Sequence, residues 1–442
     1  MNSLKQAEKY LESLIPKDLR TPKKIMRLER IRALLSFLGN PQDRFFSIHI
    51  GGTSGKGSTA CFLSYILAKA GFKVGLTLSP HVEGIRERIQ INNKKIPEKN
   101  FVKLVDMIKQ YVEQVDKELD FGRPTYFETL VAVAFWYFSQ KKVQIGVVEV
   151  GLGGKLDATN VLSSKIQVIT SVDLDHTEIL GGTVEKIAKD KVEIVKPQSL
   201  VVSAVEQASV KRIIKAKSEA KKAKLFLLGE DFGFKIKRTD LKGSVFDFWF
   251  GRKQLKSLKI LSLGEHQVRN ASLALAAICL LERINFKISQ KAIYVGLKKA
   301  FLPGRFEIIE QKPYVVLDGA HNVSKIKAFL KTLRAFFPKR RVICVLAIKE
   351  KKDIEGMVKQ LVKEVSVFFC TSFARGQEGS ISLRAMCLAE IVRKFAGGTK
   401  IFVEEDSKRA FKRALKIAER EDLICVTGSL YLVGEIRGII HS

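Results

Sequence analysis

A glycine-rich run between an apolar stretch and a helical pattern is the segment of this 442-residue sequence best suited to chemistry. It follows the expected strand Phe45–Ile50 and reads Gly51-Gly52-Thr53-Ser54-Gly55-Lys56-Gly57-Ser58-Thr59. In such a loop, backbone N–H groups and a helix N-terminus attract phosphates, the lysine reaches the outer phosphates, and a hydroxyl can meet Mg²⁺. The first glycine and Gly57 depart from the standard Walker spacing. The flanking strand and helix still favour a phosphate-binding loop over a chance glycine-rich turn.

Two further polar residues follow expected strands. Glu149 lies near the end of the strand Val143–Val150, before a glycine-rich turn, and His176 lies just after the strand Ile166–Ser171. A dinucleotide fingerprint would need glycine where Leu156 stands, so that interpretation fails. Ligands and metals lie at the carboxyl ends of strands in open α/β sheets. One carboxylate and one imidazole, completed by phosphate oxygens and water, suit Mg²⁺ or Mn²⁺, with a structural role for either residue as the alternative.

Short β-rich runs alternate with helical periodicity along the chain, which predicts an α/β fold with a mostly parallel sheet. Further strands are expected at Ser199–Ala204, Tyr314–Leu317, Arg341–Ala347, Val365–Cys370 and Leu423–Val426. Helices are expected at Ile25–Leu38, Thr59–Ala70, Asn100–Leu119, Glu128–Gln140, Ala271–Arg283, Ser324–Phe336 and Lys408–Arg420. The alternating stretch Leu225–Leu261 predicts a small antiparallel insertion. Pro303–Gly304 breaks a helical run, so we expect one domain over residues 1–302 and a second over 303–442.

The net charge of +31 is the most unusual global property of the chain. The Lys and Arg residues are spread along the whole sequence, which is more typical of a solvated basic surface than of a nucleic-acid site. Attraction of polyanionic small molecules such as ATP is a third interpretation. Six scattered cysteines without a CxxC pair predict reduced core residues. We expect no signal peptide and no membrane span, and therefore a cytoplasmic protein.

Together these motifs resemble the Mur ligase superfamily, and within it the folylpolyglutamate synthase/dihydrofolate synthase family. The resemblance runs nearly from end to end. In the first domain it covers Leu38–Gln42, the phosphate loop, Ser79–His81, Arg86–Ile89, Thr125–Glu128, Glu149–Asn160, Leu174–His176, Asp190–Lys191, His266–Gln267 and Asn270–Ala271. In the second it covers Pro303–Arg305, Asp318–Asn322 and Thr427–Ser429.

The resemblance implies an N-terminal Mur-ligase-type P-loop ATPase domain that binds ATP and folate, and a smaller C-terminal α/β, Rossmann-like glutamate ligase domain. ATP would be bound by Gly52, Thr53, Ser54, Gly55, Lys56, Gly57, Ser58 and Thr59, and by Asn270, Arg305 and Asp318. Two Mg²⁺ ions would be bound by Ser58, Ser79, Glu149, His176 and Lys191, the last carbamylated by CO₂. The pterin substrate would lie by Phe127, Gly154, Lys155, Leu156 and Asp157, and the incoming glutamate by His321 and Ser429. The catalytic residues would be Lys56, Lys191 and His321.

The implied activity is ATP-dependent addition of L-glutamate to folate, to dihydropteroate, or to both, by a monomer with no nucleic-acid or membrane partner. A carboxylate is a poor acyl donor, so a phosphoryl group must first activate it, and Lys56 with two metal ions would offset the gathered negative charge. Amine attack on the acyl phosphate then needs a closed, dry cleft, which two domains supply. Two alternatives stay open: a Mur-type ligase for a cell-wall precursor, and a nucleic-acid-binding P-loop ATPase.

The sequence departs from the family pattern at four places. Lys155 stands where Arg is usual, which removes a planar fork from the acceptor side. Asp173 stands where Gly is frequent, and Glu193 replaces a small residue. Lys351-Lys352-Asp353 replaces an Asp-Lys-Asp run. None of these positions belongs to the nucleotide-binding set.

The helical pattern around Lys191 gives the implied carbamate a physical reason. Ile187 lies four residues earlier, and Ile194 and Val195 continue the same apolar face. An inward-pointing ammonium is costly unless paired, so burial would lower its pKa and favour a neutral amine that can capture CO₂. The alternative is an ordinary surface lysine in a lysine-rich helix.

Overall fold

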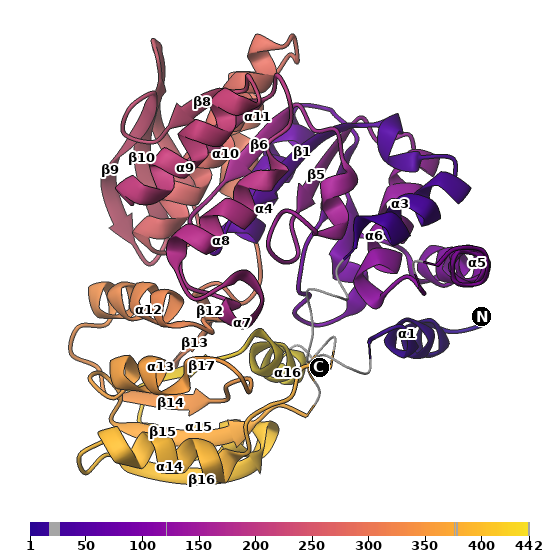
Figure 1. Ribbon diagram of the computed structural model, residues 1–442. Helices are drawn as coiled ribbons and strands as arrows, with labels where there is room; N and C mark the ends of the chain where they lie inside the picture. The colour runs from indigo at the N-terminus through magenta and orange to yellow at the C-terminus, as the bar shows by residue number, and fades with distance from the viewer. Residues whose placement is uncertain (17–26, 121, 375, 377–378, 441–442) are drawn as a thin grey trace.

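Continuous apolar runs form strands that are covered by helices on both faces, as parallel sheets require. The computed structural model describes residues 1–16, 27–120, 122–374, 376 and 379–440. Its strands form an eight-stranded, a three-stranded and a six-stranded sheet. Figure 1 shows the eight-stranded and six-stranded sheets in two bodies, with the C-terminal body below.

The first body is built on the sheet β4-β3-β2-β5-β1-β6-β7-β8. Its strands are β1 (Phe46–Gly51), β2 (Val74–Thr77), β3 (Ile89–Ile91), β4 (Lys94–Lys95), β5 (Ile145–Glu149), β6 (Ile166–Ile169), β7 (Leu200–Ser203) and β8 (Lys224–Leu227). All pairs from β2 to β8 in this order are parallel, and β3 and β4 add an antiparallel edge. The carboxyl ends of β1, β5 and β6, the three central strands, therefore meet at one edge.

Alternate residues of these strands face two different helix layers. The helices are α1 (Leu4–Ser13), α3 (Leu28–Phe37), α4 (Lys56–Lys69), α5 (Glu98–Glu118), α6 (Tyr126–Gln140), α7 (Thr177–Leu180), α8 (Val184–Lys191), α9 (Ala208–Ala220), α10 (Glu265–Arg283) and α11 (Gln290–Lys299). Ile145 and Val147 of β5 pack with α4, α10 and α11, whereas Val148 packs with α3, α5 and α6. The helices α8 and α9 cover the same face as α6, further along the sheet. Short 3₁₀ turns lie at Pro41–Arg44, Ile85–Arg88, Ala158–Val161 and Val192–Ile194.

The predicted antiparallel insertion is confirmed. It consists of β9 (Phe232–Asp240), β10 (Gly243–Phe250) and β11 (Lys253–Ile260) in the order β11-β10-β9. Its inward residues, including Phe246 and Phe248, join the core that surrounds α10. The preceding strand β8, which was predicted as part of the insertion, instead completes the parallel sheet beside β7.

The second body repeats the layered plan with the sheet β12-β13-β17-β14-β15-β16. Its strands are β12 (Glu307–Gln311), β13 (Tyr314–Leu317), β14 (Val342–Leu346), β15 (Val367–Ser372), β16 (Lys400–Asp406) and β17 (Leu423–Thr427). Its helices are α12 (Val323–Phe336), α13 (Ile354–Leu361), α14 (Ala385–Phe395), α15 (Ser407–Ile417) and α16 (Leu430–Ile440). One face packs on α12, α13 and α14 and the other on α15 and α16. Only β12 runs antiparallel to its neighbour.

The predicted strands are all present, with ends that differ by at most two residues. The predicted helices are also present. The largest difference is at α10, which begins at Glu265 instead of Ala271 because its polar first turn hides the helical pattern. Ile25 of the predicted helix Ile25–Leu38 lies outside the described residues. Five of the six cysteines are buried and Cys387 is partly exposed, with none in a disulfide. Among the described helices, none is both long and apolar enough to cross a membrane.

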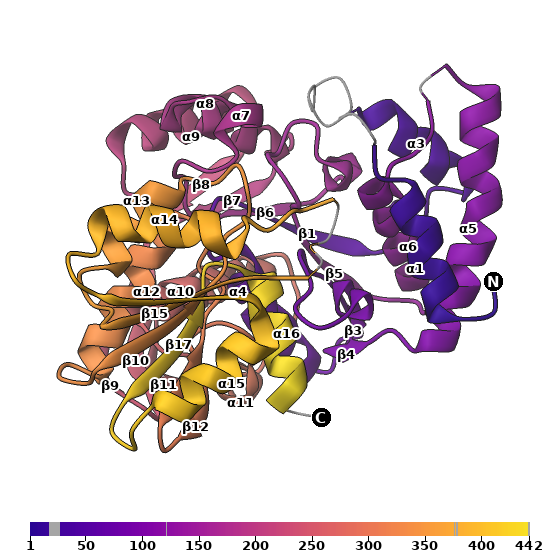
Figure 2. The same ribbon diagram turned by 90° about the horizontal axis from the view of Figure 1, so that it is seen from below.

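The two bodies touch through α16, which lies against the segment that precedes β3 (Figure 2). Arg437 of α16 pairs with Glu83 of the first body and with Glu307 of β12, the latter at 3.0 Å. Gly434 packs so closely on the Val82 backbone that no side chain would fit there. These contacts hold the second body next to the carboxyl edge of the first sheet.

The helix that follows the phosphate loop, α4, packs closely against Gly296 of α11. A Cβ on Gly296 would lie 2.5 Å from the Cα of Ile66 on α4. We predict that Gly296→Ala lowers the free energy of unfolding by about 1–3 kcal/mol, because one of the two helices must move. Gly438→Ala is the matched control, since a Cβ on Gly438 of α16 meets nothing within 4 Å. Urea unfolding measures both changes, and equal destabilisation by the two variants would contradict the packing argument.

Candidate active site

The phosphate loop is held by the segment that follows β6. The N–H of Thr53 donates to the carbonyl oxygen of Ser171 at 2.7 Å, and the N–H of Ser54 donates to the Ser171 hydroxyl at 3.1 Å. In return, the Thr170 hydroxyl donates to the carbonyl oxygen of Ser54 at 2.6 Å. These bonds fix the turn between β1 and α4, so the N-terminus of α4 opens at the carboxyl edge of the sheet, where it can attract phosphate.

Two loop glycines are required by this geometry. Gly52 has φ 136° and Gly55 has φ 86°, both in the region that disfavours side chains. A Cβ on Gly52 would overlap the Thr170 hydroxyl, and a Cβ on Gly55 would overlap the Asn270 amide. Asn270 of α10, a predicted ATP contact, therefore lies directly against the loop.

Two lysine side chains converge on the backbone of Gly52. Lys56 Nζ donates to the Gly52 carbonyl oxygen at 3.2 Å, and Lys191 Nζ donates to the same oxygen at 3.0 Å. Lys191 is the last residue of α8 and is buried, with 5% exposed. Burial, together with the charge of Lys56, lowers the pKa of Lys191 to about 7, although Asp175 opposes this shift. The inward orientation predicted for Lys191 is therefore present.

Glu149 lies on the other side of the loop. It is the last residue of β5 and is buried, and its Oε2 accepts a hydrogen bond from the Ser79 N–H at 2.9 Å. A Cβ on Gly57 would lie 3.4 Å from that oxygen, so the carboxylate lies within van der Waals reach of the loop. Burial raises the pKa of Glu149, and the charges of Lys56 and Arg305 oppose that rise.

His176 lies just after the third central strand, at the start of α7. Its ring nitrogens lie 3.9 Å from Asp175 Oδ1 and 3.8 Å from Glu178 Oε1, and burial lowers its pKa. The neutral imidazole, which is the form that ligates metals, is thus favoured. The described residues contain no group of three or more His, Cys, Asp and Glu side chains arranged to hold a metal. The predicted set has only Glu149 and His176 of these types, so it does not depend on such a group.

The predicted acceptor turn is rigid and adjoins Lys191. Asp157 is buried; its Oδ2 accepts from the Leu152 N–H at 2.8 Å and its Oδ1 from the Thr159 N–H at 3.0 Å. Burial raises the pKa of Asp157. Gly154 packs on the backbone of Lys191, and the ring of Phe127 packs on Gly151. Within this turn Lys155 is exposed and Leu156 is half-buried.

The second body contributes Arg305 and Asp318, both predicted ATP contacts. Asp318 accepts hydrogen bonds from the N–H groups of Phe306 and Ala320, each at 2.8 Å, and burial raises its pKa to about 6. Burial lowers the pKa of Arg305, while the charges of Asp318 and Glu149 oppose that shift. Glu149 belongs to the first body, so Arg305 lies close enough to act on the site across the junction.

The two predicted glutamate contacts lie in the second body. His321 places Nδ1 2.8 Å from the Gly319 carbonyl oxygen and Nε2 2.8 Å from Lys325 Nζ. Ser429 is buried, and its hydroxyl accepts from the Tyr431 N–H at 3.1 Å at the start of α16.

Asp175 joins the two bodies at the site. Its carboxylate pairs with Lys352 at 2.6 Å and accepts from the Asn322 amide at 3.2 Å, and Lys325 Nζ lies 4.0 Å away. Burial alone would raise its pKa, but Lys325, His176 and Lys352 together hold it below the ordinary value. Sequence reasoning assigned no role to Asp175, Lys325 or Lys352. Asp175 and Lys352 were at least within inspected motifs, whereas nothing in the sequence distinguishes Lys325 from the other lysines.

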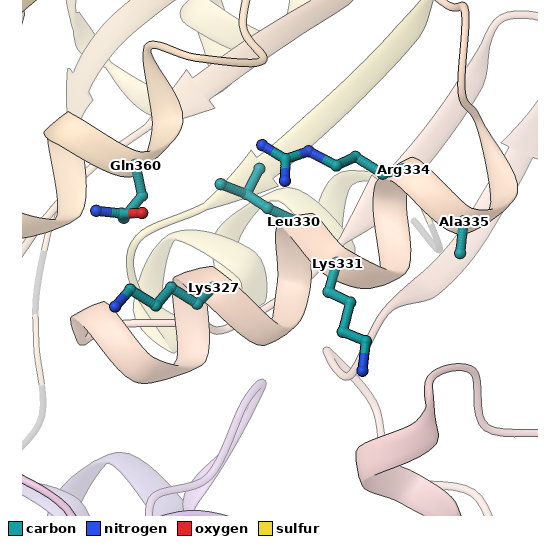
Figure 3. Close-up of a pocket in the computed structure, with 6 residues that line it drawn as sticks. All are labelled: Lys327, Leu330, Lys331, Arg334, Ala335 and Gln360. Carbon is teal, nitrogen blue, oxygen red and sulfur yellow. The ribbon is translucent and has the colours of Figure 1, made fainter.

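A surface hollow on the second body is separate from these residues. Figure 3 shows this hollow, which has a volume of about 410 Å³ and is lined by Lys327, Leu330, Lys331, Arg334, Ala335 and Gln360 of α12 and α13. Lys331 and Arg334 are already paired with Glu265 and Glu364. No predicted site residue lines the hollow, so the candidate active site is the junction between the two bodies.

The sequence matches two domain families in the same order as the two bodies. The Mur ligase middle domain matches residues 50–278, and the Mur ligase glutamate ligase domain matches residues 304–430. A phosphate loop on a parallel sheet, followed by a second α/β unit, is thus the arrangement of a Mur ligase.

Comparison with known proteins identifies the family within the Mur ligases. The chain is 32% identical to dihydrofolate synthase/folylpolyglutamate synthase of Bacillus subtilis (strain 168), over 93% of this chain and 94% of that protein. The crystal structure of Mycobacterium tuberculosis folylpolyglutamate synthase complexed with ADP and AMPPCP superposes with a TM-score of 0.91 at 28% identity, covering 99% of this chain and 98% of that one. Escherichia coli FolC in complex with DHPP and ADP gives 0.86 at 29% identity, covering 100% and 98%. The chain belongs to the folylpolyglutamate synthase/dihydrofolate synthase family of ATP-dependent ligases.

We predict that Lys56→Ala folds normally but lowers kcat by at least about 100-fold, because a cation aimed at the phosphates is lost from a preorganised loop. Lys69→Ala is the control, since Lys69 lies exposed at the other end of α4. Glutamate incorporation measures activity and thermal unfolding measures integrity. A folded Lys56→Ala variant with near-normal turnover would disprove the role of this loop.

Proposed function

We propose that the chain joins L-glutamate to the carboxylate of a folate, of dihydropteroate, or of both, through an acyl phosphate formed with ATP. The observation that carries this proposal is the convergence of Lys56, Lys191 and Glu149 on the phosphate loop, with Arg305 of the second body acting on Glu149. Several cations around a phosphate loop suit a reaction in which two anions must meet. The E. coli relative crystallised with DHPP and ADP supports this choice of ligands.

Each body would supply one part of the reaction. We propose residues 1–302 as the ATP- and folate-binding domain and residues 303–442 as the glutamate ligase domain. Gly52–Thr59, with Asn270, Arg305 and Asp318, would hold ATP. The acceptor would lie along Phe127 and Gly154–Asp157, next to Lys191. The acceptor carboxylate attacks the γ-phosphorus, ADP leaves, and the glutamate amine then displaces phosphate from the acyl carbon.

The residues beside the loop fit Mg²⁺. Glu149 is a buried carboxylate whose pKa is raised by burial, and a divalent cation would stabilise its charged form. Ser58, Ser79 and a carbamylated Lys191 would add oxygen ligands, which magnesium prefers, and His176 would add an imidazole nitrogen to complete two sites. Bound there, Mg²⁺ would neutralise the phosphate oxygens during transfer. We further propose that the protein acts as a monomer in the cytoplasm, without nucleic acid.

We predict that phosphate release requires ATP, Mg²⁺ and a pteroate-type acceptor together, and that glutamate is needed for full turnover, because water is kept from the acyl phosphate. Dihydropteroate and tetrahydrofolate, tested in parallel, show which acceptors are used. The same assay is repeated with a cell-wall precursor as the acceptor, and with added nucleic acid, to test the two alternative functions. ATP hydrolysis that is stimulated by nucleic acid and indifferent to folates would overturn the proposal.

We predict that Lys191 carries a carbamate in the active protein. A pKa near 7 leaves a large neutral fraction at pH 8, and only the neutral amine captures CO₂, so the carbamate should be lost as pH falls below about 7. Lys191→Ala should lower kcat by roughly 100-fold or more, with partial rescue by short carboxylic acids. Lys189→Ala, on the exposed side of α8, is the control. Electron density from crystals grown with bicarbonate is the direct measurement, and an unmodified Lys191 with a fully active alanine variant would contradict it.

A further inference from the structure

Both ring nitrogens of His321 are occupied by protein partners. The Gly319 carbonyl oxygen, 2.8 Å from Nδ1, can only accept, so Nδ1 carries a hydrogen. Burial, with the charges of Lys325 and Lys352, lowers the pKa of His321 well below its ordinary value, so the ring is neutral. Nε2 is then a bare lone pair, and it accepts from Lys325 Nζ at 2.8 Å. In this arrangement His321 offers no nitrogen to a substrate.

Lys325 keeps donors that His321 lacks. It lies in the first turn of α12, and its ammonium has three N–H groups, of which one goes to His321. Asp175 Oδ2 is 4.0 Å from Nζ, beyond hydrogen-bonding distance. The side chain is 22% exposed, so a ligand can reach it. The imidazole of His321 therefore orients the ammonium of Lys325, which still has N–H groups that can bind a ligand.

Asp175, Glu149 and Asp318 lie within electrostatic range of Lys325, whose Nζ hydrogen-bonds to His321. Asp175, which is 4.0 Å away, is already paired with Lys352 at 2.6 Å. Burial lowers the pKa of Lys325 to about 7; Asp175 opposes this shift, while Lys56, Lys352 and Arg305 add to it. A bound anion would raise the pKa of Lys325 again and stabilise its charged form, so a group of cations that repel one another forms a favourable site for an anion.

We propose that Lys325 is a substrate-binding residue whose ammonium binds a carboxylate of the incoming amino acid, and that His321 is a positioning residue that acts through Lys325. This inference rests on the proposed function. A carboxylate is a better match than a nucleotide phosphate, because Lys56 and the N-terminus of α4 would bind the phosphates from the first body. A contact with the side-chain carboxylate would also make the site prefer an acidic amino acid over a neutral one, whereas a contact with the α-carboxylate would not.

The test is steady-state kinetics of Lys325→Met and of Lys325→Gln, which keeps a donor for His321 but loses the charge. We expect both variants to raise the KM for glutamate by roughly 10- to 100-fold, the range for losing one charged hydrogen bond. The KM values for ATP and for the folate acceptor should stay within about twofold. Lys327→Met is the matched control, because Lys327 is exposed on the same helix and lines the hollow in Figure 3.

Two analogues identify the carboxylate: L-glutamine lacks the side-chain carboxylate, and glutamate 1-amide lacks the α-carboxylate. The wild-type preference for glutamate over one of them should collapse in Lys325→Met. Adding His321→Ala to Lys325→Met should cost little more, since both residues act through one ammonium.

Unchanged glutamate KM and unchanged discrimination in both folded variants would overturn the assignment, as would a loss confined to ATP. If the wild-type protein itself incorporates no glutamate with any folate acceptor, the proposed function fails instead. Thermal unfolding of each variant separates these results from misfolding.

Discussion

The site depends on one backbone oxygen, the carbonyl of Gly52, that two lysine amines share. Lys56 and Lys191 approach it from different helices at 3.2 and 3.0 Å, which brings two like charges together in a buried place. Such an arrangement is unfavourable unless one amine is neutral or anions are bound. The loop can hold it because the segment after β6 fixes the loop backbone independently of either lysine. Burial and the charge of Lys56 together lower the pKa of Lys191.

Asp175 extends this charge pattern into the second body. It holds Lys352 and Asn322 and lies near Lys325, all of which follow the glutamate ligase sheet strands β13 and β14. The acid that pairs with Lys352 and Asn322 therefore comes from the first body. Contacts through α16 act at a second place along the junction. Bringing the two bodies together would therefore also bring these groups together, because they pair across the junction.

The sequence predicted the elements that repeat a regular pattern. Apolar runs buried on both faces identified the strands, and the phosphate loop and Glu149 followed from their positions at strand ends. It could not predict α10's true start, because Glu265, His266 and Gln267 look like loop residues. It also assigned β8 to the insertion, since a short strand at a sheet edge alternates like an antiparallel one. Lys325 could not be predicted from the sequence, because nothing there distinguishes it from a surface lysine. Only the fold brings Asp175 and His321 beside it.

The structure shows where the basic residues that give the chain its large positive charge lie. Most of the basic residues are surface side chains, and exposed pairs such as Lys331 with Glu265 contribute little to stability. A smaller group, Lys56, Lys191, Lys325, Lys352 and Arg305, gathers at the junction together with the acids Glu149, Asp175 and Asp318. ATP, an acyl phosphate and glutamate would each bring negative charge to that place. Their binding would offset the mutual repulsion of these cations and so favour the closed, dry cleft that the acyl phosphate needs.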